Sequence, residues 1–108
     1  MASPRRGEVW LADLGMAAKV RPCLALSVPP DDTRDRALVT LVAHTTSARG
    51  SQFEVAVSAR FLSPGVFDAQ NLVTVPRVKL IRKLGDLTTG QFARVEEAVQ
   101  RWLGLRSS

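Results

Sequence analysis

Short apolar segments rich in Val, Leu, Ile or Trp recur along the first 84 residues, separated by stretches that hold Gly, Pro or clustered Asp. Segments of this length, bounded by turn-forming residues, are typical of β-strands. The segment 52–57 also alternates Phe or Val with polar or small residues, the period of two that a half-buried strand requires. The pattern predicts six strands, of which the last is the least regular: 7–14, 21–28, 37–43, 52–57, 71–75 and 78–84.

The period changes in the segment 88–105, where apolar residues recur at steps of three and four. This spacing predicts an amphipathic helix whose apolar stripe covers the core. Thr88, followed three residues later by Gln91, predicts a capping box at its start, and Gly104 a left-handed turn at its end. The stripe consists of Phe92, Val95, Val99, Trp102 and Leu103.

Six short strands followed by one helix predict a mainly β fold, a small and partly closed antiparallel barrel with a C-terminal α-helix. The chain has 108 residues, so we expect one domain over 1–108. Hydrophobic residues make up 45% and charged residues 23%, the composition of a globular protein. No apolar run is long enough to span a bilayer and the N-terminus lacks a secretory signal, so we expect no membrane association and a cytoplasmic location.

The chain has a single cysteine, Cys23, in the apolar segment 21–28. One cysteine forms neither an internal disulfide nor a cysteine cluster for zinc, and we expect no metal site and no cofactor. We interpret Cys23 as a small core residue, with a nucleophilic role as the alternative.

The chain is strongly basic, with fifteen Lys and Arg against ten Asp and Glu and a formal net charge of +5. Such a charge attracts polyanions and makes nucleic acid a plausible partner, although a basic surface also keeps a small protein soluble. The stretch 39–50, "VTLVAHTTSARG", is of particular interest, because an apolar strand ends there in the only histidine, three hydroxyl residues and an arginine.

Several segments occur in an order that resembles a known family. "RRGEVWLADL", "RPCLALS", "VAHTTS" followed by "FEVAV", "NLVTVPRVKLIRKLGDL" and a helix ending in "WLGL" are together similar to the MazF/PemK toxins of type II toxin–antitoxin systems, which belong to the CcdB superfamily. The resemblance covers nearly the whole chain. It implies an SH3-like barrel, a homodimer, and a metal-independent endoribonuclease that cuts single-stranded RNA at short sequences. It also implies a cognate antitoxin, whose extended acidic segment would compete with RNA for a basic groove.

The resemblance implies that Arg21 and Thr46 line the cleavage site. Arg21 offers a planar set of donors to a phosphate, and Thr46 a hydroxyl with little conformational freedom. Without the family, a surface salt bridge for Arg21 and a turn cap for Thr46 would be the simpler interpretations. Residues expected to bind RNA around them are Lys19, His44, Ser47, Arg49, Gln70, Asn71, Arg77 and Lys79.

The chain departs from the family pattern in two places. Many relatives have a proline and an aliphatic residue before the Thr-Ser step, where this chain has His44 and Thr45. An imidazole suits proton transfer near neutral pH, but His44 shares a face with Thr46 only if the strand continues that far. The second departure is at 68–71, where Asp68 stands one or two positions from its expected place, which leaves a carboxylate base there in doubt.

Two other functions remain open at this stage. One is a non-catalytic CcdB-like toxin that traps DNA gyrase through its terminal helix, and the other is a barrel that only binds nucleic acid. The presence of both Arg21 and Thr46 favours the ribonuclease. Because the basic residues of one copy are too few for an extended channel, we expect the RNA groove to run across the interface of a homodimer.

Overall fold

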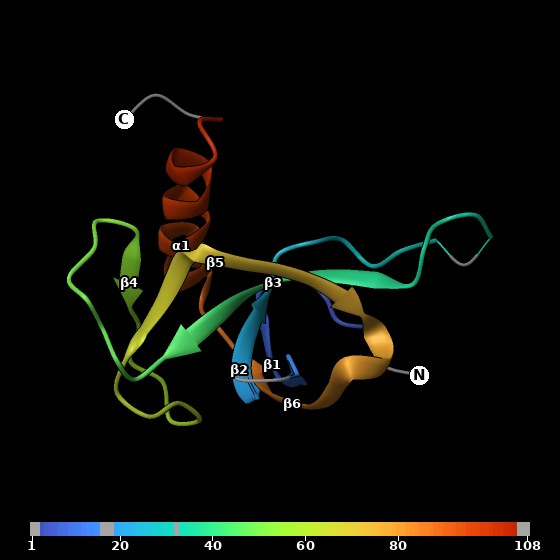
Figure 1. Ribbon diagram of the computed structural model, residues 1–108, viewed down its shortest axis with the longest axis horizontal. Coiled ribbons are helices and arrows are strands. Elements are labelled where there is room, and N and C mark those ends of the chain that lie inside the picture. The colour runs from blue at the N-terminus through green and yellow to red at the C-terminus, as the bar shows by residue number, and fades with distance from the viewer. Residues whose placement is uncertain (1–2, 16–18, 32, 106–108) are drawn as a thin grey trace.

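The computed structural model describes residues 3–15, 19–31 and 33–105, which form strands, one short 3₁₀-helix and one α-helix (Figure 1). The predicted order of elements, six strands followed by a terminal helix, is confirmed. In chain order the elements are β1 Glu8–Asp13, β2 Val20–Ala25, β3 Leu38–Thr45, β4 Glu54–Ala56, β5 Val66–Pro76, η2 Arg77–Lys79, β6 Leu80–Asp86 and α1 Thr89–Trp102.

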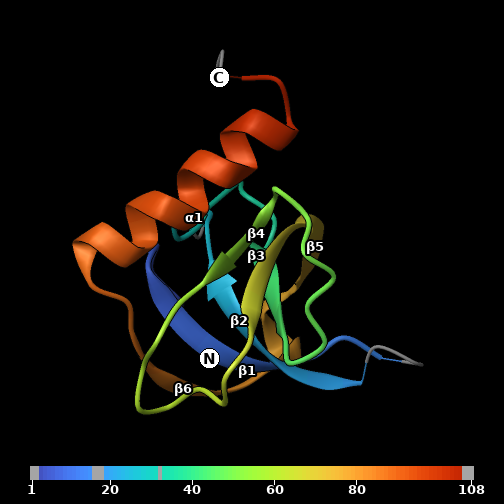
Figure 2. The same cartoon turned by 90° about the vertical axis from the view of Figure 1, so that its left-hand side faces the viewer.

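The strands form one antiparallel sheet in the order β4-β5-β3-β2-β1-β6. β4 and β6 are its outer strands, so the sheet curls without closing. Figure 2 shows α1 lying across one end of the curled sheet, and α1 contacts β4 and β5. The expected fold class, a partly closed barrel with a C-terminal helix, is confirmed.

The central strands are buried on both faces because each face has its own core. In β2, Leu24 joins the cluster that includes Val95 and Val99 of α1, whereas Cys23 and Ala25 join a second cluster on the other face. This is the alternation that a strand imposes on its side chains. Cys23 is fully buried, and burial raises the pKa of its thiol to about 12. The interpretation of Cys23 as a core residue is therefore confirmed.

The observed boundaries of all six strands differ from the predicted ones by at least one residue, and those of β5 differ most. β5 begins at Val66, five residues before the predicted start, and the predicted strand 78–84 begins at Leu80 because η2 occupies Arg77–Lys79. The three polar residues within 68–71 hid the first half of β5, since the segment forms an irregularity within the strand. Phe67 pairs with His44 and Leu72 with Val42, so between these two pairs β5 advances by five residues while β3 advances by two. The extra residues of β5 lie in a bulge at 68–71.

Both predicted caps of α1 are present, but the C-terminal end of its apolar stripe lies outside the core. The side chains and backbone amides of Thr88 and Gln91 bond reciprocally in a capping box, and Gly104 has a φ of +72° in the closing turn. Trp102 and Leu103, expected in the core, are 43% and 50% exposed, because the helix extends past the sheet there. α1 is too short and too polar to cross a membrane, and it is the longest helix among the described residues.

The connection between β4 and β5 presses its backbone against the end of β3. A Cβ added to Gly65 would collide with the carbonyl oxygen of Thr45 and lie 2.9 Å from Cε1 of His44. Backbone atoms of a paired strand have little room to move, so this position accepts only glycine. The contact fixes the loop 57–65 relative to the last residues of β3.

We predict that Gly65→Ala lowers the free energy of unfolding by about 1–3 kcal/mol, the usual cost of overpacking. Chemical denaturation followed by circular dichroism measures this. Gly90→Ala is the matched control, since a Cβ at Gly90 meets nothing within 4 Å and the residue lies in α1. There alanine should leave stability unchanged or raise it slightly. Equal stability of the two variants would contradict the close approach at Gly65.

Candidate functional site

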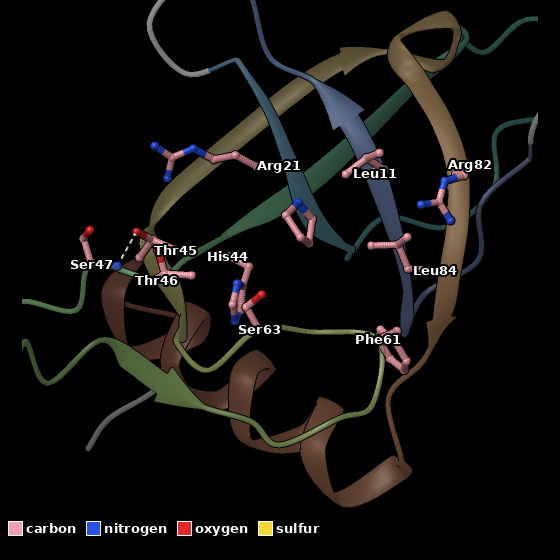
Figure 3. Close-up of a pocket in the computed structure, with 11 residues that line it drawn as sticks. Leu11, Arg21, His44, Thr45, Thr46, Ser47, Phe61, Ser63, Arg82 and Leu84 are labelled. Carbon is pink, nitrogen blue, oxygen red and sulfur yellow. Dashed lines mark hydrogen bonds between the residues drawn. The ribbon is translucent and has the colours of Figure 1, made fainter.

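Four strands, β1, β2, β3 and β6, and the loop 57–65 surround a pocket of about 400 Å³ (Figure 3). β2 supplies Arg21 and Pro22, and β3 with the turn after it supplies the four residues 44–47. The outer wall comes from β1, β6 and the loop, through Leu11, Arg82, Leu84, Phe61 and Ser63. Figure 3 shows Arg21 and Arg82 on different sides of the pocket, with His44 and Ser63 between them.

Strand pairing brings Arg21 beside the turn that follows β3. Cys23 pairs with Ala43, and Arg21, two residues before Cys23, lines the same pocket as Thr45, two residues after Ala43. Arg21 is half-buried, so its long side chain is supported by the sheet while its guanidinium reaches the pocket. Two segments that are far apart in the sequence thus contribute a cation and hydroxyl groups to one place.

The two neighbouring threonines of this turn have different roles. The hydroxyl of Thr45 accepts a hydrogen bond of 3.0 Å from the backbone amide of Ser47, which holds the turn (Figure 3). The exposed hydroxyl of Thr46 lines the pocket and forms no hydrogen bond with any described residue. Turn capping, the simpler interpretation of Thr46, is therefore performed by Thr45, and Thr46 can donate to a ligand.

His44 lies at the inner side of the pocket and is almost fully buried, with 3% exposure. Its ring packs edge-on against Phe67, with 5.0 Å between centroids, and burial lowers its pKa below the usual 6.5. The imidazole is therefore neutral at pH 7. Its Nε2 atom is buried without a hydrogen-bond partner among the described residues. β3 continues to Thr45, so His44 is still part of the strand and does line the same pocket as Thr46.

A second pocket of about 570 Å³ adjoins the first and shares Arg21, Thr45 and Ser47 with it. Its other walls come from the loop after β3, the start of β4, the bulge of β5 and the end of α1. They consist of Arg49, Glu54, Asp68, Gln70, Asn71 and Trp102. The two pockets form a continuous cleft that runs past Arg21, which we call the Arg21 cleft.

The loop that carries Arg49 is held by one carboxylate. Glu54 accepts hydrogen bonds from the backbone amides of residues 49, 50 and 51, at 2.8 to 3.1 Å. These bonds, above all that from the amide of Arg49, hold the pKa of Glu54 below its usual range. Glu54 is therefore an ionised structural group that fixes the edge of the second pocket.

The structure brings together seven of the ten predicted site residues. Arg21, His44, Thr46, Ser47, Arg49, Gln70 and Asn71 all line the Arg21 cleft. Lys19, Arg77 and Lys79 line neither pocket, and the Nη1 of Arg77 donates instead to the hydroxyl of Ser3. A role of these three residues in RNA binding stays a prediction.

Several lining residues were not singled out from the sequence as site residues. Phe61, Ser63 and Arg82 come from segments far from 39–50, and only the curl of the sheet brings them to the pocket. Trp102 had been assigned to the core because of its helical spacing. Within 3–15, 19–31 and 33–105, no three His, Cys, Asp or Glu side chains gather as ligands for a metal.

Comparison with known proteins gives a matching family and several similar structures. The model of the PemK-like, MazF-like toxins of type II toxin–antitoxin systems matches residues 5–103. An endoribonuclease from a mycobacterial species is similar in structure, with a TM-score of 0.80 and 29% identity over 100% of this chain and 98% of that one. A mycobacterial endoribonuclease in complex with its cognate antitoxin has a TM-score of 0.81 and 30% identity over 98% of this chain and 100% of that one.

The toxin MazF-mt6 of Mycobacterium tuberculosis is 30% identical over 93% of this chain and 99% of that one, with a TM-score of 0.74. The family match spans most of the chain, and the similar structures share its fold, a curled sheet with a terminal helix. The chain belongs to the family of PemK-like, MazF-like toxins of type II toxin–antitoxin systems.

Proposed function

We propose that this protein is a sequence-specific endoribonuclease toxin that cleaves single-stranded RNA without a metal ion. The observation that carries the proposal is the placement of Arg21 and the free hydroxyl of Thr46 in one pocket, reached by the pairing of β2 with β3. The similar mycobacterial proteins are named endoribonucleases, which supports the same activity here. RNA as the substrate also makes the cytoplasm the proposed site of action.

The chemistry requires alignment, stabilisation of charge and proton transfer, and no metal ion. The 2′-hydroxyl of RNA gives up its proton and attacks the adjacent phosphorus in line, the bond to the 5′-oxygen breaks, and that oxygen takes up a proton. The products are a 2′,3′-cyclic phosphate and a 5′-hydroxyl. The guanidinium of Arg21 stabilises the negative charge that develops on the phosphoryl oxygens, and Thr46 donates a hydrogen bond that orients the phosphate.

His44 contributes a different kind of group to the same pocket. It is neutral at pH 7, and its buried Nε2 has no partner among the described residues. A neutral imidazole can accept a hydrogen bond from the 2′-hydroxyl or from a base edge. His44 is therefore proposed to bind the RNA, together with Ser47 and Arg49 along the Arg21 cleft.

We also propose regulation by a cognate antitoxin. One similar mycobacterial endoribonuclease is in complex with its antitoxin. An extended acidic segment would find in the Arg21 cleft the cations Arg21, Arg49 and Arg82, and would compete there with RNA. The gyrase alternative is not favoured, since the matching family model describes PemK-like, MazF-like toxins.

We predict that Arg21→Ala lowers the rate of RNA cleavage at least about a hundredfold, because loss of one preorganised charge stabiliser has this effect. The measurement uses a long single-stranded RNA in EDTA, with circular dichroism as the test of folding. Arg36→Ala is the matched control, an exposed arginine that lines neither pocket, and it should cleave at the wild-type rate.

Two results would contradict the proposal. A folded Arg21→Ala variant that cleaves as fast as the wild type would remove Arg21 from the site. A wild-type protein that binds the RNA but leaves it uncut in EDTA would favour the barrel that only binds nucleic acid.

We further propose a homodimer that forms along the outer strand β6. Val78 in η2 and Ile81 in β6 are large apolar residues at this edge and are 69% and 53% exposed. An unpaired strand edge with exposed apolar side chains is suited to association with a second copy. A two-fold axis there would present the same surface from both copies and extend the groove across the interface.

Light scattering should give about twice the monomer mass of 11.8 kDa at micromolar concentration. Ile81→Glu should shift the mass to that of the monomer, because it buries a charge in the interface. Val28→Glu is the control, since Val28 is 68% exposed in the loop between β2 and β3. A monomeric wild type that cleaves RNA at its full rate would refute the composite groove.

A further inference from the structure

The position of Trp102 is unusual for an apolar residue on an amphipathic helix. Its spacing predicts a core position, yet it is 43% exposed and lines the second pocket, whose other lining residues are all polar. Its ring contacts that of Phe53, with centroids 5.3 Å apart and planes at 59°. This contact supports the indole while part of its surface stays open to the pocket. A large aromatic surface in that position is suited to stacking with another flat ring.

The bulge of β5 adds polar side chains, one of them a hydrogen-bond acceptor, to the pocket that Trp102 lines. Asp68, Gln70 and Asn71 line the same pocket as Trp102. Asp68 uses Oδ1 to accept a 3.0 Å hydrogen bond from the backbone amide of Gln70. Oδ2 of Asp68 makes no hydrogen bond with any described residue, whereas both oxygens of Glu54 already accept backbone amides. Asp68 is therefore the carboxylate that can take a ligand.

The second pocket carries no excess of positive charge that would select a phosphate. The carboxylates of Glu54 and Asp68 balance the cations Arg21 and Arg49 on its walls, and Arg21 stands at the boundary with the first pocket. Because both pockets share Arg21, an RNA strand with its scissile phosphate at Arg21 reaches the second pocket with an adjacent nucleotide. The cleft thus separates a site for the phosphate from a site for a neighbouring base.

We propose that the second pocket binds the nucleobase next to the cleaved phosphate, stacked on Trp102 and selected as guanine by Asp68. Guanine presents two adjacent donors, N1–H and N2–H, on one edge, and a carboxylate can accept both. Uracil presents one donor flanked by carbonyl oxygens, which the carboxylate repels. The proposal rests on the proposed ribonuclease function and adds a source of its sequence specificity.

One experiment measures base binding without RNA cleavage. Guanosine 5′-monophosphate is titrated into the full-length protein, and the two indole N–H signals are followed by NMR, assigned through Trp10→Phe and Trp102→Phe. The signal of Trp102 should shift, with uridine 5′-monophosphate at least about tenfold weaker, and the signal of Trp10 should stay in place, since Trp10 lines neither pocket. Asp68→Asn should remove the preference for guanine while Trp102 remains able to stack.

A second experiment reads the sequence at the cut sites. A long RNA is cleaved and the new ends are sequenced, and the wild type should show guanine enriched at one position beside the cut. Asp68→Asn should lower that enrichment at least about tenfold, and Trp102→Ala should raise KM, whereas Trp102→Phe should retain most of the affinity. Leu103→Ala is the matched control, because Leu103 is equally exposed at the end of α1 but lines neither pocket.

The two experiments distinguish a failure of the proposed guanine site from a failure of the proposed ribonuclease function. If the indole N–H signal of Trp102 does not shift with guanosine monophosphate, or shifts equally with the uridine nucleotide, the guanine site is overturned even if the protein cleaves RNA. A selective shift of Trp102 in a protein that leaves RNA uncut supports the base site and overturns the ribonuclease. Cleavage with no guanine enrichment beside the cut also overturns the site.

Discussion

The antiparallel pairing of β2 with β3 is the constraint on which the site depends. Its register pairs Cys23 with Ala43, and Arg21, two residues before Cys23, lines the same pockets as Thr45, two residues after Ala43. Both strands are buried on both faces, so a slip of the register would move every core side chain of β2 to the wrong face. The hydrophobic core therefore fixes the distance between the cation and the hydroxyl turn, and no direct bond between them is needed for that purpose.

Two irregular features complete the cleft around this pair. The close approach of Gly65 to Thr45 holds the loop 57–65, which carries Phe61 and Ser63, against the end of β3. The bulge 68–71 of β5 turns polar side chains toward the second pocket, where a regular strand would have continued its pairing. The regular sheet supplies rigidity, and the departures from regularity supply the groups that face a ligand.

The sequence predicted those features that depend on local patterns. Thr88 and Gln91 form the capping box because both partners lie within one turn, and the alternation in 52–57 is visible in the burial of Val55 and Val57. Features that depend on distant pairing were missed. The three polar residues within 68–71 concealed the first half of β5, and Trp102 follows the helical period although it is partly exposed. Arg82 reaches the pocket only through the curl of the sheet, which no local pattern encodes.

The central claim is that Arg21 and Thr46 act together on one phosphate, and a double-mutant cycle tests it most directly. Cleavage rates of a single-stranded RNA are compared for wild type, Arg21→Ala, Thr46→Val and the double variant, all confirmed as folded. When two residues hold the same phosphate as a unit, the rate losses caused by their substitutions do not add as free energies. The double variant should therefore cleave less than about threefold more slowly than the slower single variant. Losses that multiply, or a Thr46→Val variant as fast as wild type, would contradict the account.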